Sequence, residues 1–456
     1  MPGLFNTLTT TADALGVFEK ALNTVSNNVA NSGTPGYAKQ TFTIVAQPFD
    51  PTLGLPGGIS AGEIQSSRDE YAEQTVWQDQ QGFGLADQSA TELSGIQPLF
   101  DVTGNSGLPA ALNAFFQSFS ALSVSPNDSV ARNNVLSSAS ALAQRFNSTA
   151  TGLANASINL NTELGSATDA INGLTQQIGQ LNTQMQDDAT SRTDPAVDAS
   201  LHNDLESLAE YVNFTALRQP DGSVTVLMDG QTPLVIGDQQ YAIQASAGSG
   251  TAVVTDANGK DVTAQAVGGR LAALIDMKNT VLPGFSNSLN QLAAGLADQV
   301  NNTLLNGVDQ SGNQGAQLFS YNNPSDAAST LQTTGITVDQ IAAALPGAPG
   351  GNGNALNLAA LDDAPQAGGM TFTQSYASLA SQVGQSLNSA TEDRQTQQDL
   401  LDQARTTRSN AESVSLDEEA TQMIEYQRAY QATARVVTIL NDLTETVMNM
   451  LETGTA

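Results

Sequence analysis

His202 is the first residue of this 456-residue chain to consider for chemistry, because it is the only histidine. A Ser-His-Asp triad would have to use it as the base. Cysteine is absent, which excludes thiolate nucleophiles, disulfides and cysteine-type zinc sites. His202 lies in the polar segment AVDASLHNDLESL, whose apolar positions are typical of an amphipathic helix. We therefore expect His202 to be a solvent-exposed helix residue, and we predict no catalytic residue.

Paired carboxylates are a second possible source of chemistry, since two of them can hydrolyse a glycosidic bond. Asp187-Asp188 and Asp362-Asp363 are two such pairs. With 45 acidic residues in the chain, adjacent pairs arise by chance. We expect both pairs to be solvated loop residues, and we predict that the protein is not an enzyme.

A calcium loop is suggested by Asp309, Ser311 and Asn313, which have the spacing of the first ligands of an EF-hand. The match then fails, because position six is Gln314 instead of glycine and position twelve is Ser320 instead of glutamate. An Asx-type turn is the better prediction. The segment PGAPGGNGN has no following Lys-Ser/Thr, so it is not a phosphate-binding loop. We predict no metal and no cofactor.

The charge balance restricts the possible partners. The 45 acidic and 15 basic residues give a formal net charge of −30, which would repel a nucleic acid. The sequence has no run of about eighteen apolar residues, so we expect no membrane partner. The start, MPGLFNTLTTTADALG, lacks the basic region and apolar core of a cleaved signal peptide. A cytoplasmic location is expected unless the chain is exported by a route that needs no such signal.

The elements that stand out are two helices at the ends of the chain, each with an apolar stripe at heptad spacing. The first stripe comprises Leu8, Leu15, Phe18, Leu22, Val25 and Val29. The second comprises Leu416, Ala420, Met423, Tyr430, Ala434 and Val437, and it continues on a slightly rotated face through Leu440, Leu443, Val447 and Met450. Each stripe needs a helical partner, so both helices are predicted to form a subunit interface.

The fold class is predicted to be mainly α, with long terminal helices in a coiled-coil-like core and an inserted β-rich domain. At 456 residues the chain is long enough for two or three domains. After Tyr211 the apolar period changes to two, with Pro-Asp-Gly and Asp-Gly turns between the runs. The predicted domains are a discontinuous terminal assembly domain (1–68 and 375–456), a helical central domain (69–211 and 270–374, loop-rich at 306–369) and the β-rich insertion (212–269).

Two helices of the interior carry specific expectations. The helix that runs from Asp69 toward Phe100 is predicted to be interrupted near Gly82 to Gly84. The helix from Phe372 to Ala411 is polar along the second half of its seam, so we expect that half to be poorly buried.

The terminal helices are expected to be marginal alone. Burying six apolar residues gains about 9 to 18 kcal/mol, whereas ordering the backbone costs about 1 to 2 kcal/mol per residue. We therefore expect both ends to be mobile in the free subunit and to fold when neighbouring copies pack around them. The alternative is a self-contained bundle within one chain.

The segment NNVANSGTPGYAKQ, at Asn27 to Gln40, resembles the N-terminal signature of bacterial flagellar rod, hook and hook-associated proteins. The end of the chain, with SLDEEATQMIEYQRAYQATARVV, is similar to the terminal helix of the same proteins. Three interior segments, 114–147, 268–277 and 306–319, resemble the flagellar hook-associated protein 1 family. The signature residues singled out here are Asn27, Asn28, Asn31, Thr34, Pro35, Gly36 and Tyr37.

The resemblance implies a structural subunit that polymerises at the distal end of the hook and forms the hook-filament junction. Its implied partners are further copies of itself, the hook subunit, the next hook-associated protein and a cytoplasmic export chaperone on the C-terminal helix. It also implies export through the flagellar type III apparatus to the outside of the cell. Another axial protein, a hook or distal rod subunit, is the nearest alternative, and an axial protein with hydrolase activity is a weaker one.

Overall fold

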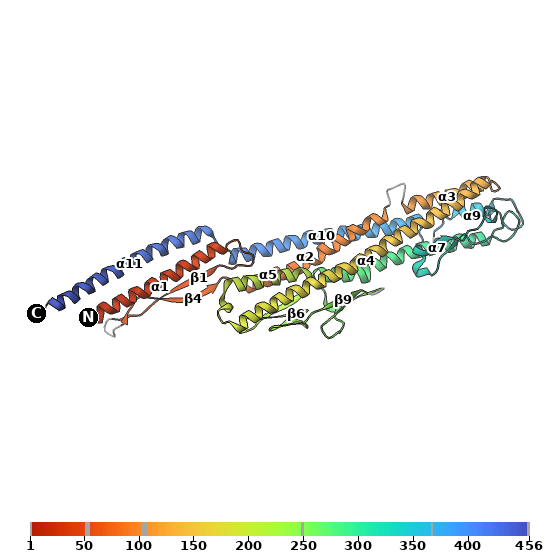
Figure 1. Ribbon diagram of the computed structural model, residues 1–456. Helices are drawn as coiled ribbons and strands as arrows, with labels where there is room; N and C mark the ends of the chain where they lie inside the picture. The colour runs from red at the N-terminus through yellow and green to blue at the C-terminus, as the bar shows by residue number, and fades with distance from the viewer. Residues whose placement is uncertain (1, 51–54, 102–106, 248–249, 366–367, 454–456) are drawn as a thin grey trace.

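The computed structural model describes residues 2–50, 55–101, 107–247, 250–365 and 368–453. The molecule is elongated, and the two termini lie together at one end (Figure 1). There α1 (Pro2–Asn31) and α11 (Leu416–Thr453) run side by side in opposite directions. The fold class is confirmed, because long helices dominate and the sheets are small.

Two short antiparallel hairpins follow α1. Strand β1 (Gln40–Ala46) pairs with β4 (Ile59–Ser66), and β2 (Phe49–Asp50) pairs with β3 (Leu55–Pro56). Both β1 and β4 contact α1. The hairpin thus covers a side of α1, and we call α1, these strands and α11 together the terminal unit.

Long helices form the rest of the rod. They are α2 (Glu70–Ile96), α3 (Leu108–Val124), α4 (Ser129–Asp187), α5 (Pro195–Tyr211), α6 (Gly269–Asp276), α7 (Leu282–Leu305) and α10 (Phe372–Glu412). Asp69, Asp128 and Asp194 cap α2, α4 and α5 by accepting hydrogen bonds from backbone N–H groups of the first turn. The starts of these helices are therefore set locally by the sequence.

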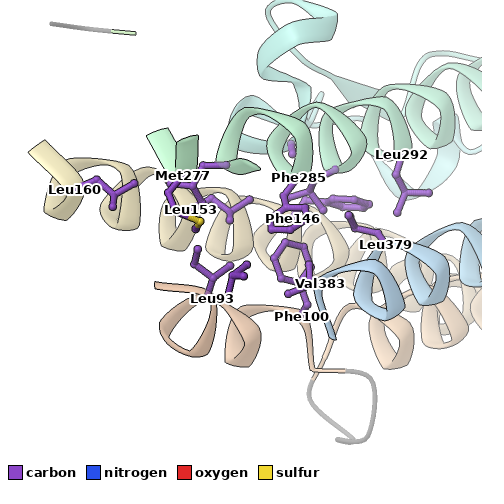
Figure 2. Packing of buried hydrophobic residues seen from close by; sticks show 14 of the residues in the cluster. Leu93, Phe100, Phe146, Leu153, Leu160, Met277, Phe285, Leu292, Leu379 and Val383 are labelled. Carbon is purple, nitrogen blue, oxygen red and sulfur yellow. The ribbon is translucent and has the colours of Figure 1, made fainter. Parts of the chain in front are cut away.

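One continuous core joins these helices. Figure 2 shows a part of it, where Phe100, Phe146 and Phe285 meet beside Leu379 and Val383. The rings of Phe100 and Phe285 are 6.0 Å apart and nearly edge to face. Because these five residues come from four segments far apart in sequence, the core fixes the rod as a unit.

The predicted interruption near Gly82 to Gly84 is wrong, since α2 runs unbroken from Glu70 to Ile96. A Cβ at Gly84 would lie 2.2 Å from the carbonyl oxygen of Glu210, at the end of α5. A Cβ at Gly82 would meet the amide of Gln397 on α10. These glycines therefore permit close helix packing rather than breaking the helix.

In the described part of the chain between α5 and α6 there are six short strands. Strands β5 (Phe214–Arg218), β6 (Val224–Met228), β7 (Thr232–Ile236) and β8 (Gln239–Gln240) form an antiparallel sheet, and β9 (Gln244–Ala247) pairs with β10 (Ala252–Thr255). Asp229 and Gly230 adopt positive φ angles of 50° and 66° at the β6–β7 turn, as the Asp-Gly signal predicts. The strand-rich character of this segment is confirmed.

The segment 306–369 is loop-rich, as predicted, although residues 366 and 367 lie outside the described part. It contains β11 (Phe319–Ser320), α8 (Ala327–Thr330), β12 (Gln332–Thr333) and α9 (Gly353–Ala360). Asp309 Oδ1 accepts hydrogen bonds from the N–H groups of Ser311 and Asn313, both at 2.8 Å. The predicted Asx-type turn is confirmed.

Asparagines on the helices hold strands and loops in place. Each of five asparagine side chains accepts a hydrogen bond from the N–H of one residue and donates one to the C=O of that same residue. We call these pairs the amide staples, and they are Asn28–Gln40, Asn172–Ile243, Asn182–Val224, Asn279–Ala252 and Asn301–Phe319. They satisfy backbone groups that a strand would otherwise leave unpaired beside a helix.

Candidate functional site

Among the residues that the structure describes, no group of three or more Asp, Glu or His side chains could hold a metal. His202, predicted to be exposed, is instead 2% exposed. Its ring stacks on Trp77 with the centroids 5.7 Å apart. The prediction was wrong because the face of α5 that carries His202 packs against α2.

The signature segment folds into a hydrogen-bonded hub around Asn28, which is 1% exposed. Besides its staple to Gln40, the Asn28 side chain accepts from the Tyr37 hydroxyl at 2.9 Å and donates to Glu419 at 3.0 Å. Lys39 forms an ion pair with Glu419 at 3.4 Å. Glu419 belongs to α11, so this hub ties the two terminal helices together.

Burial around the hub also affects Tyr37. Burial, and secondly the charge of Glu419, raise the pKa of the Tyr37 hydroxyl to about 12. The hydroxyl therefore stays protonated and keeps donating its hydrogen bond to Asn28. The hydrogen bond from Tyr37 to Asn28 is therefore unaffected by pH changes near neutrality.

Gly36 brings the signature turn against the body of the rod. Its φ is +73°, a conformation that favours glycine, and a Cβ there would lie 2.4 Å from the carbonyl oxygen of Ala199 on α5. The Gly36 carbonyl oxygen accepts a hydrogen bond of 2.6 Å from Arg68. The turn is therefore a contact between the terminal unit and α5.

A buried charged cluster lies where the terminal unit meets the rod. We call it the junction cluster, and its members are Arg68, Glu73, Asp198, His202, Glu206, Arg408 and Glu412. Arg68 lies at its centre and contacts three carboxylates: Glu73, Asp198 at 2.7 Å and Glu412 at 3.3 Å. These residues come from α2, α5 and α10 and from the residues just before α2, so the cluster joins four parts of the chain.

Arg408 completes the cluster from α10. Its guanidinium lies 2.9 Å from Glu73 and 2.7 Å from Glu206. Burial acts to raise the pKa of Glu73, but His202, Arg408 and Arg68 outweigh it and lower that pKa to about 2. The second half of α10, which we expected to be poorly buried, thus contributes side chains to a buried ionic contact, although Arg394 stays half exposed beside Asp87.

Glu412, the last residue of α10, connects the cluster to the signature segment. Its backbone oxygen accepts a hydrogen bond from the N–H of Lys39 at 2.8 Å, and its carboxylate accepts one from the N–H of Asp69 at 2.9 Å. Burial is the largest influence on this carboxyl and raises its pKa to about 7, with the charge of Glu73 adding to the effect.

The raised pKa of Glu412 predicts a pH dependence. Because that pKa rises from 4.5 to about 7 on folding, the contribution of Glu412 to stability is full below pH 4.5 and is lost as pH rises through 7. Glu412→Gln is neutral throughout, so its free energy of unfolding relative to the wild type should increase by at most about 3 kcal/mol between pH 5 and pH 8. Urea unfolding of both proteins at the two pH values measures this, and a pH-independent difference would contradict it.

The structure places the predicted interface residues in three environments. Val25 and Leu440 are buried within the chain itself. Val29, Leu416 and Leu443 are exposed. The other members are partly buried along the two terminal helices, and they are Leu8, Leu15, Phe18, Leu22, Met423, Tyr430, Val437 and Val447.

Further exposed apolar side chains of the terminal unit escaped the heptad analysis. Val436 and Ile439 of α11 are 44% and 57% exposed, and Phe5 of α1 is 52% exposed. A heptad pattern finds the stripe that faces one partner helix, and these residues lie off that stripe. A count of all apolar positions around the α11 helix would have found them.

None of the helices within the described ranges is long and apolar enough to span a membrane.

The two ends of the chain, whose helices pair at one end of the rod, match family models of bacterial flagellar axial proteins. Residues 8–37 match the flagella basal body rod protein family, and residues 408–450 match the C-terminal family of flagellar basal body rod FlgEFG proteins. Residues 93–319 match the helical domain of the flagellar hook-associated protein FlgK. The chain belongs to the flagellar hook-associated protein 1 (FlgK) family.

Individual relatives agree. The chain is 28% identical to flagellar hook-associated protein 1 of Bacillus subtilis over the whole length of both. It is 30% identical to that of Salmonella typhimurium over 71% of this chain and 62% of the relative. The structure of the flagellar hook junction protein FlgK from Burkholderia pseudomallei has the same fold, with a TM-score of 0.68, 14% identity and coverage of 75% of this chain and all of that one.

Proposed function

We propose that this chain polymerises through its terminal unit at the distal end of the bacterial hook and serves as a structural subunit of the hook-filament junction. The observation that carries the proposal is the exposed apolar surface of α11. Val436, Ile439 and Leu443 lie on one side of this helix and are each at least 44% exposed, and Leu416 and Ile424 are exposed elsewhere on it. Surfaces of this kind mark protein contacts.

The distribution of charge along the chain also favours the terminal unit as the contact site. Residues 69–412 contain 34 acidic and ten basic side chains, whereas residues 1–68 contain four acidic and three basic side chains. Residues 413–456 contain seven and two. Copies of the chain therefore repel each other along the rod. The repulsion is weakest at residues 1–68, so copies can pack closely there at the lowest electrostatic cost.

The other partners are the hook subunit on one side and the next hook-associated protein on the other. An export chaperone would bind the amphipathic α11, in the manner of a helix in a groove. The chain would reach the flagellum through the type III export route without a cleaved signal. The family relationship and the exposed apolar residues of α11 support these partners.

A single charged substitution tests the assembly site. Leu443→Glu places a carboxylate where a neighbouring copy is expected to pack, and burying it unpaired should lower polymer formation by about tenfold or more. Leu356→Glu is the matched control, because Leu356 is 52% exposed on α9 at the other end of the rod, against 47% for Leu443. Sedimentation of concentrated protein, with electron microscopy of the pellet, measures polymer. Equal loss in both variants would contradict the proposal.

A further inference from the structure

The terminal unit carries a groove on α1 as well as the exposed row on α11. The groove has a volume of about 620 Å³ and lies between α1 and the β1–β4 hairpin. Asp13, Gly16, Val17 and Lys20 line it from the helix, and Ile59 and Ala61 line it from the hairpin. We call it the α1 groove.

The α1 groove faces away from the chain's own α11. Asp13 and Lys20 lie about half a turn round the helix from Leu15 and Leu22, which belong to the apolar stripe of α1. That stripe is partly buried, and α11 is the helix that contacts α1 most. The chain therefore cannot fill the groove with its own C-terminal helix.

Helix α11 carries a row of exposed apolar side chains that could fill such a groove. Val436, Ile439 and Leu443 follow each other at steps of three and four residues, so they form one row along the helix. They are 44%, 57% and 47% exposed. We call this row the α11 ridge. It lies about a third of a turn round the helix from Tyr430 and Val437, which are partly buried.

We propose that the α11 ridge of one copy docks into the α1 groove of the next copy. The groove has free space at Gly16, since a Cβ built there would meet no atom within 4 Å. The ridge supplies the large apolar side chains that such a space lacks. This inference rests on the proposed self-association and names the two surfaces that make it.

The charges on the two surfaces are compatible with this contact. The groove holds one acid, Asp13, and one base, Lys20, and the ridge is bordered by Arg435 and Asp442. Within the described ranges no ion pair is formed by these four side chains. Both surfaces are neutral in sum, so they escape the mutual repulsion of the acidic rod.

Ridge and groove are different surfaces, so the contact is heterologous. Each copy then offers a free groove at one side and a free ridge at the other, and such contacts build rings or helical filaments. A symmetric dimer would instead bury the same surface from both copies and stop there.

The absence of native cysteine allows a direct test by disulfide cross-linking. One full-length variant carries Gly16→Cys and a second carries Ile439→Cys, and the two are mixed, polymerised and oxidised. Docking should hold the two thiols at high effective concentration and give about tenfold more cross-linked dimer than the control. The control mixes Ile439→Cys with Gly173→Cys, because Gly173 lies on the exposed side of α4 and its Cβ also meets nothing within 4 Å.

The outcomes separate this inference from the proposed function. Cross-linking in the mixture, and in neither variant alone, supports the ridge-in-groove contact. Cross-linked dimers from a single variant would show a symmetric contact and overturn it. Polymer without cross-links would also overturn it while the proposed function stands, and a wild-type chain that forms no polymer at high concentration would overturn both.

Discussion

Arg68→Ala is expected to destabilise the protein by about 3 to 5 kcal/mol, because it removes the cation shared by three carboxylates. The Arg68 side chain is 5% exposed, so water cannot replace it readily. The variant would leave Glu73 and Glu412 close together without their common partner. Because Arg68 also holds the Gly36 carbonyl, the terminal unit should lose its fixed attachment to the rod.

The midpoint of urea unfolding measures the loss of stability, and hydrogen exchange of α1 and α11 measures the attachment. Arg218→Ala is the matched control, since Arg218 also pairs with Asp198, at 2.8 Å, but its side chain is 37% exposed. An exposed pair contributes at most about 1 kcal/mol. Similar losses in the two variants would show that burial of the junction cluster does not determine its contribution.

Asn28→Ala is expected to separate the two terminal helices, with a loss of about 3 kcal/mol. The change leaves the N–H and C=O of Gln40 and the carboxylate of Glu419 without their Asn28 partner inside the hub. Each buried polar group left unpaired costs about 1 to 3 kcal/mol. Exchange should speed up in α1, in β1 and at the start of α11, while α4 keeps its protection.

Asn27→Ala serves as the control for this prediction. Asn27 is the preceding residue on the same helix, it is exposed, and its side chain bonds only to Asn31 among the residues whose contacts are described. A surface change of this kind is usually within about 0.5 kcal/mol of neutral. If exchange in Asn27→Ala increased as much as in Asn28→Ala, the hub would have no special role.

The sequence predicted the helices and strands well where local signals are strong. The helix start at Asp69 and the Asp229-Gly230 turn depend on residues close by in the chain, so both could be predicted from the sequence. The interruption of α2 was predicted wrongly, because Gly84 allows close contact with the carbonyl of Glu210, more than a hundred residues away in the chain. The division into domains stays a prediction.

The candidate site was predicted only in part. The signature residues Asn28 and Tyr37 stand out in the sequence, and the structure brings them together with Glu419. The junction cluster was missed, because charged residues spread over 345 positions give no periodic signal before they meet. His202 illustrates the difficulty: its helix face looks polar in sequence, yet Trp77 and Glu73 of α2 cover it.

The amide staples have a consequence for how the chain responds to pH and salt. Asparagine carries no charge and does not titrate, so neither acid nor salt screening weakens these five attachments directly. The junction cluster around Arg68 does not share this property, because the raised pKa of Glu412 lets that carboxyl change protonation near neutral pH. A change of pH through about 7 should therefore alter the contact between the terminal unit and the rod before it disturbs the amide staples.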